Sequence, residues 1–220
     1  TMYQTLVFDL DGTLTDSKEG IINCVIYALN YYGITNRSDS FLNQFIGPPL
    51  TQSFQQFCGF DEEKAKEAAA KYRERFSTIG LFENRPYEGA VDMLRELKQA
   101  GKTIALATSK PEVFMKKIIA RYGLAPYIDH PVGATLDDSR SKKSDVILEA
   151  LRQCGITTEE QKKNCLMIGD RFHDIRGAKE TNLDSLGCAW GYAKEGELKE
   201  AGATYICETI KEATNFLLSH

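Results

Sequence analysis

The chain has 220 residues, of which 42% are hydrophobic and 26% charged, and its formal net charge is −4. This composition is typical of a globular protein with room for one ordinary domain and a smaller insert. No basic run stands out and no apolar stretch approaches about 20 residues, so we expect neither a nucleic acid polymer nor a membrane as partner. The six cysteines are scattered without a C-x-x-C pair, which favours a reducing, cytoplasmic location over a disulfide framework.

The first predicted element is a strand at residues 5–8, an apolar and β-branched run. It leads directly into Asp9-Leu10-Asp11-Gly12-Thr13. An Asp before Gly is common turn chemistry, and an Asp after a strand often only caps the next helix. Two carboxylates separated by one residue at a buried strand end, however, call for a metal or a cationic partner.

Residues 16–84 break the pattern of the rest of the chain, since they contain helical periodicity and no convincing strand. An apolar stripe runs from Ile22 to Leu29 and stops at Gly33, and residues 61–78 predict a second long helix. We therefore predict an all-helical insert at 16–84, in a chain whose other domain comprises residues 1–15 and 85–220. Gly47 and Pro48, within the insert, fit either a plain helix-to-helix turn or a loop that faces a substrate.

After the insert, strand and helix patterns alternate. Amphipathic helices are predicted at 89–99 and 144–153, and further strands are predicted at 103–107, 131–133, 165–168, 185–189 and 204–206. This alternation predicts βαβ units and hence an α/β fold with a doubly wound, mostly parallel sheet.

A second acidic cluster follows the predicted strand at 165–168 and contains Asp170 and Asp174. In an open α/β sheet, ligands bind beyond the carboxyl ends of the strands. If the strands before Asp9 and before Asp170 are neighbours, several negative charges converge there, and such a site needs a cation. All-oxygen ligands suit a hard ion, so we expect Mg²⁺.

These motifs resemble those of the haloacid dehalogenase-like phosphohydrolase superfamily, in its phosphoglycolate phosphatase-like branch with a helical cap. Asp9-Leu10-Asp11-Gly12-Thr13 resembles the first motif, and Thr108, after a strand, resembles the second. Lys143, before a predicted helix that starts at Ser144, resembles the third. Asp170 and Asp174 resemble the fourth, so the resemblance spans Leu6 to about Ala178.

The resemblance implies a phosphatase that acts through an aspartyl-phosphate. Asp9 would be the nucleophile, and Asp11 would protonate the leaving group and then activate water. Mg²⁺ would be held by Asp9, by the backbone carbonyl of Asp11, and by Asp170, with Asp174 either contacting the ion or supporting its ligands.

The remaining implied roles concern the phosphoryl group. Thr108 and backbone N–H groups near Leu10 and Ser109 would bind its oxygens, and Lys143 would add a positive charge. Taken alone, Thr108 and Ser109 also fit the start of a helix. We expect His173 to orient the fourth-motif loop, and Trp190 and Tyr192 to be packing residues.

The substrate is expected to be a small phosphorylated metabolite, and the protein a monomer or homodimer. A 5′-nucleotidase, a pyrophosphatase and a sugar phosphomutase are alternatives on the same core. Three further alternatives fit the sequence less well. A receiver-type signalling domain would lack the helical insert and Asp11, and a dehalogenase would not need Asp11. A non-catalytic protein would not need all the proposed catalytic residues together.

Overall fold

The computed structural model describes residues 2–220. Within them, six strands form one sheet in the order β5-β4-β1-β6-β7-β8, and all neighbouring pairs are parallel. The strands are β1 (Thr5–Phe8), β4 (Thr103–Pro111), β5 (His130–Ala134), β6 (Cys165–Gly169), β7 (Asp184–Cys188) and β8 (Tyr205–Cys207). The predicted α/β class and parallel sheet are confirmed.

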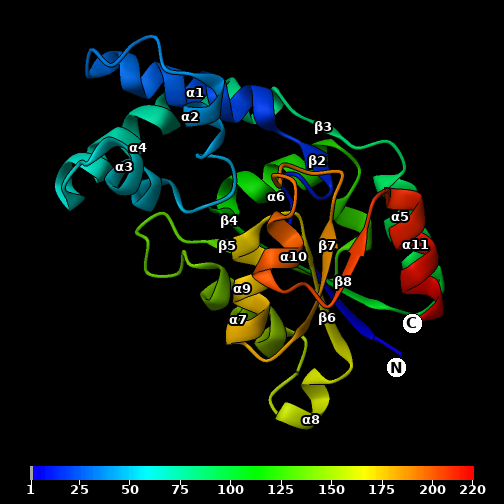
Figure 1. The fold of residues 1–220 in the computed structure, drawn as a ribbon. Helices are drawn as coiled ribbons and strands as arrows, with labels where there is room; N and C mark the ends of the chain where they lie inside the picture. The colour runs from blue at the N-terminus through cyan, green and yellow to red at the C-terminus, as the bar shows by residue number, and fades with distance from the viewer. Residues whose placement is uncertain (1) are drawn as a thin grey trace. The chain divides into compact units, whose positions relative to one another are not determined.

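Helices cover both faces of this sheet (Figure 1). They are α5 (Ala90–Gln99), α6 (Glu112–Arg121), α7 (Lys143–Gln153), α8 (Glu159–Lys162), α9 (Phe172–Glu180), α10 (Glu197–Ala201) and α11 (Ile210–Ser219), with a 3₁₀ turn η2 (Ala125–Tyr127). α7 and α9 pack on one face, and α5 and α11 lie on the opposite side. Alternate residues of each central strand therefore meet different helices, and both sets are buried because helices shield both faces.

One hydrophobic core lies between the sheet and α7. Val7 of β1, Ala105 of β4 and Met167 of β6 point to this face and pack with Val146 and Ile147 of α7. β1 is the central strand, with Val7 level with Ala105 on one side and Met167 on the other. This register places the carboxyl ends of β4, β1 and β6 side by side.

By its internal contacts the chain divides into two compact units. The first contains the described residues up to Thr15 together with Pro86–His220, and the second is Asp16–Arg85. Short strands β2 (Thr15–Asp16) and β3 (Arg85–Pro86) pair where the chain passes from one unit to the other. The sequence did not predict these strands, because two residues are too few to show a period.

The second unit is helical. Its elements are α1 (Lys18–Tyr31), α2 (Asp39–Asn43), α3 (Leu50–Cys58), α4 (Glu62–Phe76) and the 3₁₀ turn η1 (Gly80–Phe82). α1 packs against α4 and η1. A side chain at Gly20 would overlap the Gly80 carbonyl, so this glycine permits the close approach of η1 to α1.

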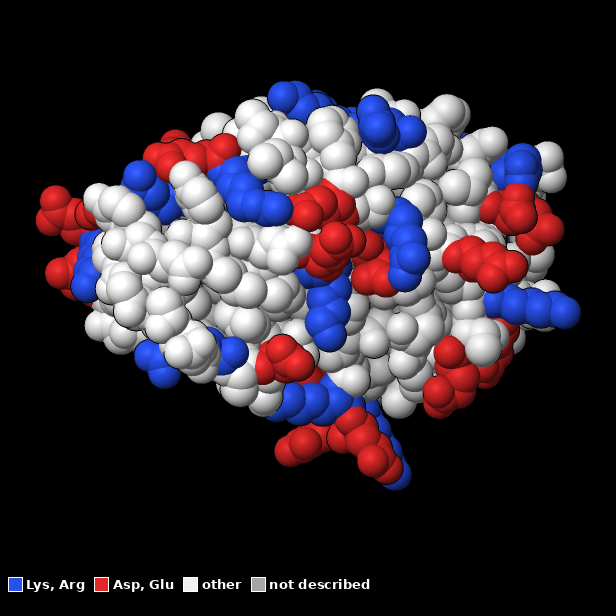
Figure 2. Space-filling model, turned by 90° about the horizontal axis from the view of Figure 1, so that it is seen from above, with Lys and Arg blue, Asp and Glu red and all other residues white. Residues whose placement is uncertain are grey.

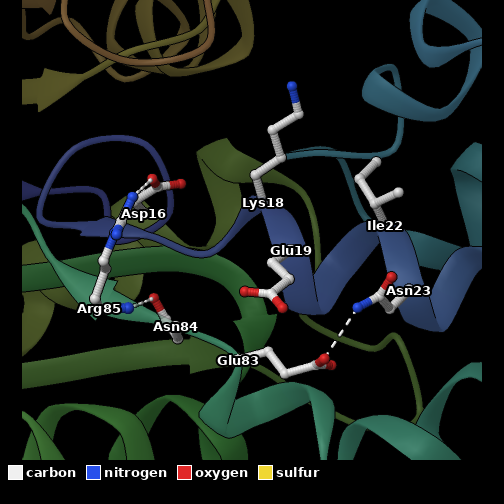
Figure 3. Close-up of a pocket in the computed structure, with 8 residues that line it drawn as sticks. All are labelled: Asp16, Lys18, Glu19, Ile22, Asn23, Glu83, Asn84 and Arg85. Carbon is white, nitrogen blue, oxygen red and sulfur yellow. Dashed lines mark hydrogen bonds and ion pairs between the residues drawn. The ribbon is translucent and has the colours of Figure 1, made fainter.

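A pocket of about 400 Å³ lies within this second unit, between the start of α1 and residues 83–85 (Figure 3). Arg85 pairs with Asp16 at 3.4 Å, and Asn23 donates a hydrogen bond to Glu83 at 2.9 Å. These contacts tie the two ends of the helical unit to each other.

None of the helices in residues 2–220 is long and apolar enough to cross a bilayer. On the face displayed in Figure 2, acidic and basic side chains are interspersed, with uncharged areas between them.

Candidate active site

The first-motif residues continue β1 beyond its last residue. The Asp9 N–H donates a hydrogen bond of 2.8 Å to the carbonyl of Ile168, so the backbone still pairs with β6 at this point. Thr13, Leu14 and Thr15 then donate their N–H groups to the Leu10 carbonyl, which folds the chain into a tight loop. The loop holds Asp9 and Asp11 at the sheet edge where β6 also ends.

Asp9, Asp170 and Asp174 form a three-acid cluster. One carboxylate oxygen from each lies within 4.8 Å of those from the other two, and all three residues are buried. The sheet order explains the meeting, because β1 and β6 are neighbours and the second acidic segment follows β6 directly. The predicted convergence of these carboxylates is thus present in the structure.

Lys143 supplies a positive charge to this cluster. Its Nζ lies 2.8 Å from Asp9 Oδ1 and 2.9 Å from Asp174 Oδ1, and it donates a further hydrogen bond of 3.1 Å to the Ala107 carbonyl. The residue is the first of α7 rather than the residue before it. Its neighbour Lys142 is exposed, which agrees with the choice of Lys143 from the sequence.

Burial and like charge change the acidity of the cluster. Burial, together with the charge of Asp174, raises the pKa of Asp9 to about 7 although Lys143 opposes the change. Burial and the charges of Asp174 and Asp9 raise the pKa of Asp170 well above its usual value. Burial also acts to raise the pKa of Asp174, but Lys143 and neighbouring donors outweigh it and the pKa is lowered. Burial and like charge thus disfavour the charged forms of Asp9 and Asp170, and Lys143 does not fully offset this effect at Asp9.

The Asp170 carboxylate is held by the first-motif loop and by the segment after β7. Thr13 Oγ1 donates to Asp170 Oδ1 at 3.3 Å, and the Tyr192 N–H donates to Asp170 Oδ2 at 2.8 Å. A Cβ at Gly12 or at Gly191 would overlap Asp170 itself. Two glycines therefore leave room for this carboxylate.

The interpretation of Trp190 and Tyr192 as packing residues was incomplete. Tyr192 binds Asp170 through its backbone N–H, and Trp190 Nε1 donates a 3.1 Å hydrogen bond to the Thr13 carbonyl. A backbone donor leaves no side-chain signal in a sequence, so this contact could be found only in the structure.

Asp174 also stabilises the start of α9, the helix that contains it. Its Oδ2 accepts the N–H groups of Asp170 and Arg171, each at 3.1 Å, at the start of α9. Its Oδ1 faces Lys143. Asp174 thus fixes the fourth-motif loop and orients Lys143 as well as contributing to the cluster.

The Asp11 carboxylate has a different partner. Its Oδ1 lies 3.0 Å from Lys110 Nζ, with both side chains less than 9% exposed, and it does not belong to the three-acid cluster. A metal contact from Asp11 would therefore come from its backbone carbonyl, as the resemblance implies. Lys110 was not among the predicted site residues. Its position directly after Thr108-Ser109 was the available signal.

The second-motif residues lie at the end of β4. Thr108 and Ser109 are buried, and Thr108 Oγ1 accepts the Lys110 N–H at 3.1 Å. Within residues 2–220, the Ser109 hydroxyl is buried without a hydrogen-bond partner. An unpartnered buried hydroxyl costs free energy unless a ligand or water completes it, so Ser109 is suited to bind one.

Two other predicted residues stand apart from this arrangement. Gly47 and Pro48 form the turn before α3 in the second unit, so the predicted turn exists, and their contact with a substrate stays a prediction. Neither ring nitrogen of His173 has a hydrogen-bond partner within residues 2–220, and burial lowers the pKa of this side chain to about 4. The structure therefore shows no hydrogen bond by which His173 would orient the loop.

Comparison with known proteins agrees with this geometry. Residues 6–188 match the family model described as haloacid dehalogenase-like hydrolase. The chain belongs to the haloacid dehalogenase-like hydrolase family. A solved structure described as a predicted phosphatase from Clostridium acetobutylicum matches with a TM-score of 0.95 and 43% identity over the whole of both chains.

Curated relatives of this hydrolase carry several names. A 5′-nucleotidase from Pseudomonas aeruginosa is 40% identical over 99% of this chain and 97% of its own length. The tyrosine-protein kinase PtkA of Mycobacterium tuberculosis H37Rv is 34% identical over 92% of this chain and 68% of its own length. A phosphoglycolate phosphatase from Colwellia psychrerythraea is 26% identical over 95% and 94%. The phosphatases among these relatives support a phosphatase built on the family core.

Proposed function

We propose that this hydrolase is a Mg²⁺-dependent phosphatase that cleaves a small phosphomonoester through a phosphorylated Asp9. The observation that carries the proposal is that the two first-motif carboxylates have different partners. Asp9 faces the three-acid cluster and Lys143, whereas Asp11 faces Lys110. This arrangement supports nucleophilic attack by Asp9 beside a cation site and proton transfer by Asp11.

The residues present fit a magnesium ion. Three buried carboxylates offer hard oxygen ligands. Burial and like charge raise the pKa of Asp170, and a bound cation would oppose this shift. The missing side chains at Gly12 and Gly191 leave room for the Asp170 carboxylate, which supports its proposed role as a ligand. Asp9, Asp170 and the Asp11 carbonyl would hold the ion, with Asp174 beside them. When bound, the ion supplies positive charge that offsets repulsion between the nucleophile and phosphate.

The reaction divides into two transfers. Asp9 attacks phosphorus, the bond from phosphorus to the leaving oxygen breaks, and Asp11 delivers its proton to that oxygen. Water then attacks the phosphorylated Asp9, Asp11 takes a proton from the water, and inorganic phosphate leaves with Asp9 restored. Thr108 and Ser109 would donate hydrogen bonds to phosphoryl oxygens, and Lys143 would add positive charge to phosphate and nucleophile.

The substrate is proposed at the level of its class. The family resemblance and the relatives' names point to 5′-nucleotides, phosphoglycolate and pyrophosphate, and we place the 5′-nucleotide first because the 40% identical relative bears that name. A sugar phosphomutase is the remaining alternative on this core. The helical insert would act as the cap, with Gly47 and Pro48 facing the substrate. A monomer or homodimer in the cytoplasm fits this role.

The proposal is tested by phosphate release across a set of phosphorylated metabolites with Mg²⁺ present. Asp9→Asn should abolish release while leaving the unfolding transition intact, since it removes one of several crowded negative charges. Asp145→Asn, which changes an exposed aspartate on α7, is the matched control and should keep full activity. Full activity of Asp9→Asn would refute the mechanism, and its unfolding would show that Asp9 is structural.

A further inference from the structure

Lys110 and Asp11 form an ion pair whose two side chains are only 6% and 8% exposed, with Nζ and Oδ1 at 3.0 Å. Two charged side chains are rarely buried unless they are paired, because each loses its hydration. The resemblance that assigns roles to Asp9, Asp11, Thr108 and Lys143 assigns none to Lys110. A role for this lysine has to come from the structure.

The position of Lys110 depends on an irregularity in β4. The register of β4 against β5 shifts between Ala107 and Pro111, and such irregularities redirect side chains beside active sites. Gly133 of β5 packs against this segment, and a Cβ there would lie 2.8 Å from the Lys110 carbonyl oxygen. The glycine therefore permits the close approach of β5 to the Lys110 backbone at this irregularity.

Two of the buried lysines, Lys110 and Lys143, contact different acidic groups. Lys143 contacts Asp9 and Asp174, whereas Lys110 contacts Asp11. A carboxylate two residues from Asp9, if it had no cation of its own, would be drawn toward any cation held by the three-acid cluster. Lys110 supplies that separate cation, at 3.0 Å from Asp11 Oδ1.

We propose that Lys110 is a positioning residue that holds the Asp11 carboxylate outside the three-acid cluster, where it can serve the leaving group. This inference rests on the proposed function. In the step concerned, the bond from phosphorus to the leaving oxygen breaks as the bond from Asp9 forms, and the proton of Asp11 goes to the leaving oxygen. Lys110 does not touch the reacting atoms. It fixes where the donor lies.

The decisive measurement is the dependence of kcat/KM on the leaving group. Phenyl phosphates whose phenols differ in pKa need proton donation to different degrees, and p-nitrophenyl phosphate needs it least. Lys110→Met should lower kcat on the poorest leaving group by about 10²-fold, within the range of general acid catalysis, and kcat on p-nitrophenyl phosphate far less. KM should change little. Lys110→Arg, which keeps the charge, should restore part of the loss.

The matched control is Lys116→Met, because Lys116 is exposed on α6 and pairs with Glu112 at 3.4 Å. This variant should have unchanged kcat and KM on every substrate. Asp11→Asn should show the same leaving-group dependence as Lys110→Met. The kcat of the double variant should be no lower than that of Asp11→Asn alone.

A readout without substrate completes the test. Lys110→Met leaves the Asp11 carboxylate buried without its cation and should lower the midpoint of denaturant unfolding. The same substitution in the Asp11→Asn background should lower it less. An equal loss of activity on every leaving group would overturn the inference, and so would additive losses of activity in the double variant. In either case, wild-type activity would still uphold the proposed function. Failure of the wild type to release phosphate from any substrate would refute both.

Discussion

Gly12 shows how a single residue determines the space around Asp170. It has φ of 80°, and a Cβ there would overlap the Asp170 carboxylate. Gly123 has nearly the same backbone, with φ of 76°, but a Cβ there would meet nothing within 4 Å. Comparing alanine substitutions at these two glycines separates backbone strain from steric overlap. Both positions have a positive φ, but of the two only Gly12 has a neighbouring side chain in the way.

Gly12→Ala should therefore destabilise the protein more than Gly123→Ala. The backbone cost of a left-handed alanine is about 1–2 kcal/mol in both variants. Overlap at Gly12 should add about 1–3 kcal/mol and displace Asp170, so activity falls as well. Denaturant unfolding and phosphate release measure the two effects. Equal destabilisation by the two alanines would mean that the Asp170 side chain can move away from the new methyl group without a measurable cost in stability.

A second prediction concerns the buried cation of the cluster. Lys143→Met leaves Asp9 and Asp174 without the ammonium group that lies 2.8 and 2.9 Å away. Breaking a buried ion pair in this way costs about 3–5 kcal/mol, and we expect turnover to be lost as well. Lys142→Met alters the exposed neighbour and should have little effect on either quantity. Urea unfolding curves with parallel rate measurements would distinguish the two lysines.

Among the elements, the helical unit is joined at its ends by Glu83. The Glu83 carboxylate accepts hydrogen bonds from Arg75 at 2.6 and 3.3 Å and from Asn23 at 2.9 Å, so it connects α4, α1 and the segment that leaves the unit. The hydrogen bonds from Arg75 lower the pKa of Glu83 despite its partial burial.

The sign of the resulting pH dependence follows from that direction. A lowered pKa means that the charged carboxylate stabilises the folded state above its unfolded pKa, and that this contribution disappears as pH falls through the folded pKa. Glu83→Gln should cost about 1 kcal/mol at pH 7, and the difference from wild type should shrink toward pH 3. Glu62→Gln breaks an exposed pair with Lys66 and serves as control. A pH-independent difference would show that the carboxylate charge is irrelevant.

Periodicity predicted the six strands of the sheet and the helices α1, α4, α5 and α7, and its failures have physical causes. The central strands β1, β4 and β6 are almost fully buried apolar runs, which made them the easiest to predict. The end of β4 was missed because Thr108, Ser109 and Lys110 are polar and do not resemble a strand. Asp9 and Asp170 were predictable because adjacent strand ends meet at one sheet edge, whereas Lys143 was suggested by the family resemblance. The pairing of Lys110 with Asp11 was not predictable, because Lys110 lies in a segment of β4 whose register against β5 shifts, and such a shift leaves no mark in the sequence.

At the scale of the whole molecule, the proposed Mg²⁺ site predicts that metal binding and folding are linked. An ion that binds the folded chain and not the unfolded one stabilises it by about 2.7 kcal/mol at 100 times its dissociation constant. We expect Mg²⁺ to raise the unfolding temperature and EDTA to reverse the increase. Asp170→Asn should remove this response, whereas Asp145→Asn should keep it. An unchanged response in Asp170→Asn would place the ion elsewhere.

The chain contains one tryptophan, Trp190, and its indole N–H is bonded to the carbonyl of Thr13. Indole emission shifts in wavelength and intensity when the polarity or hydrogen bonding around the ring changes. The protein therefore contains a single indole, hydrogen-bonded to the loop that carries both first-motif aspartates. Spectra recorded without any dye or label would follow events in that loop alone, free of overlapping signals from other indoles.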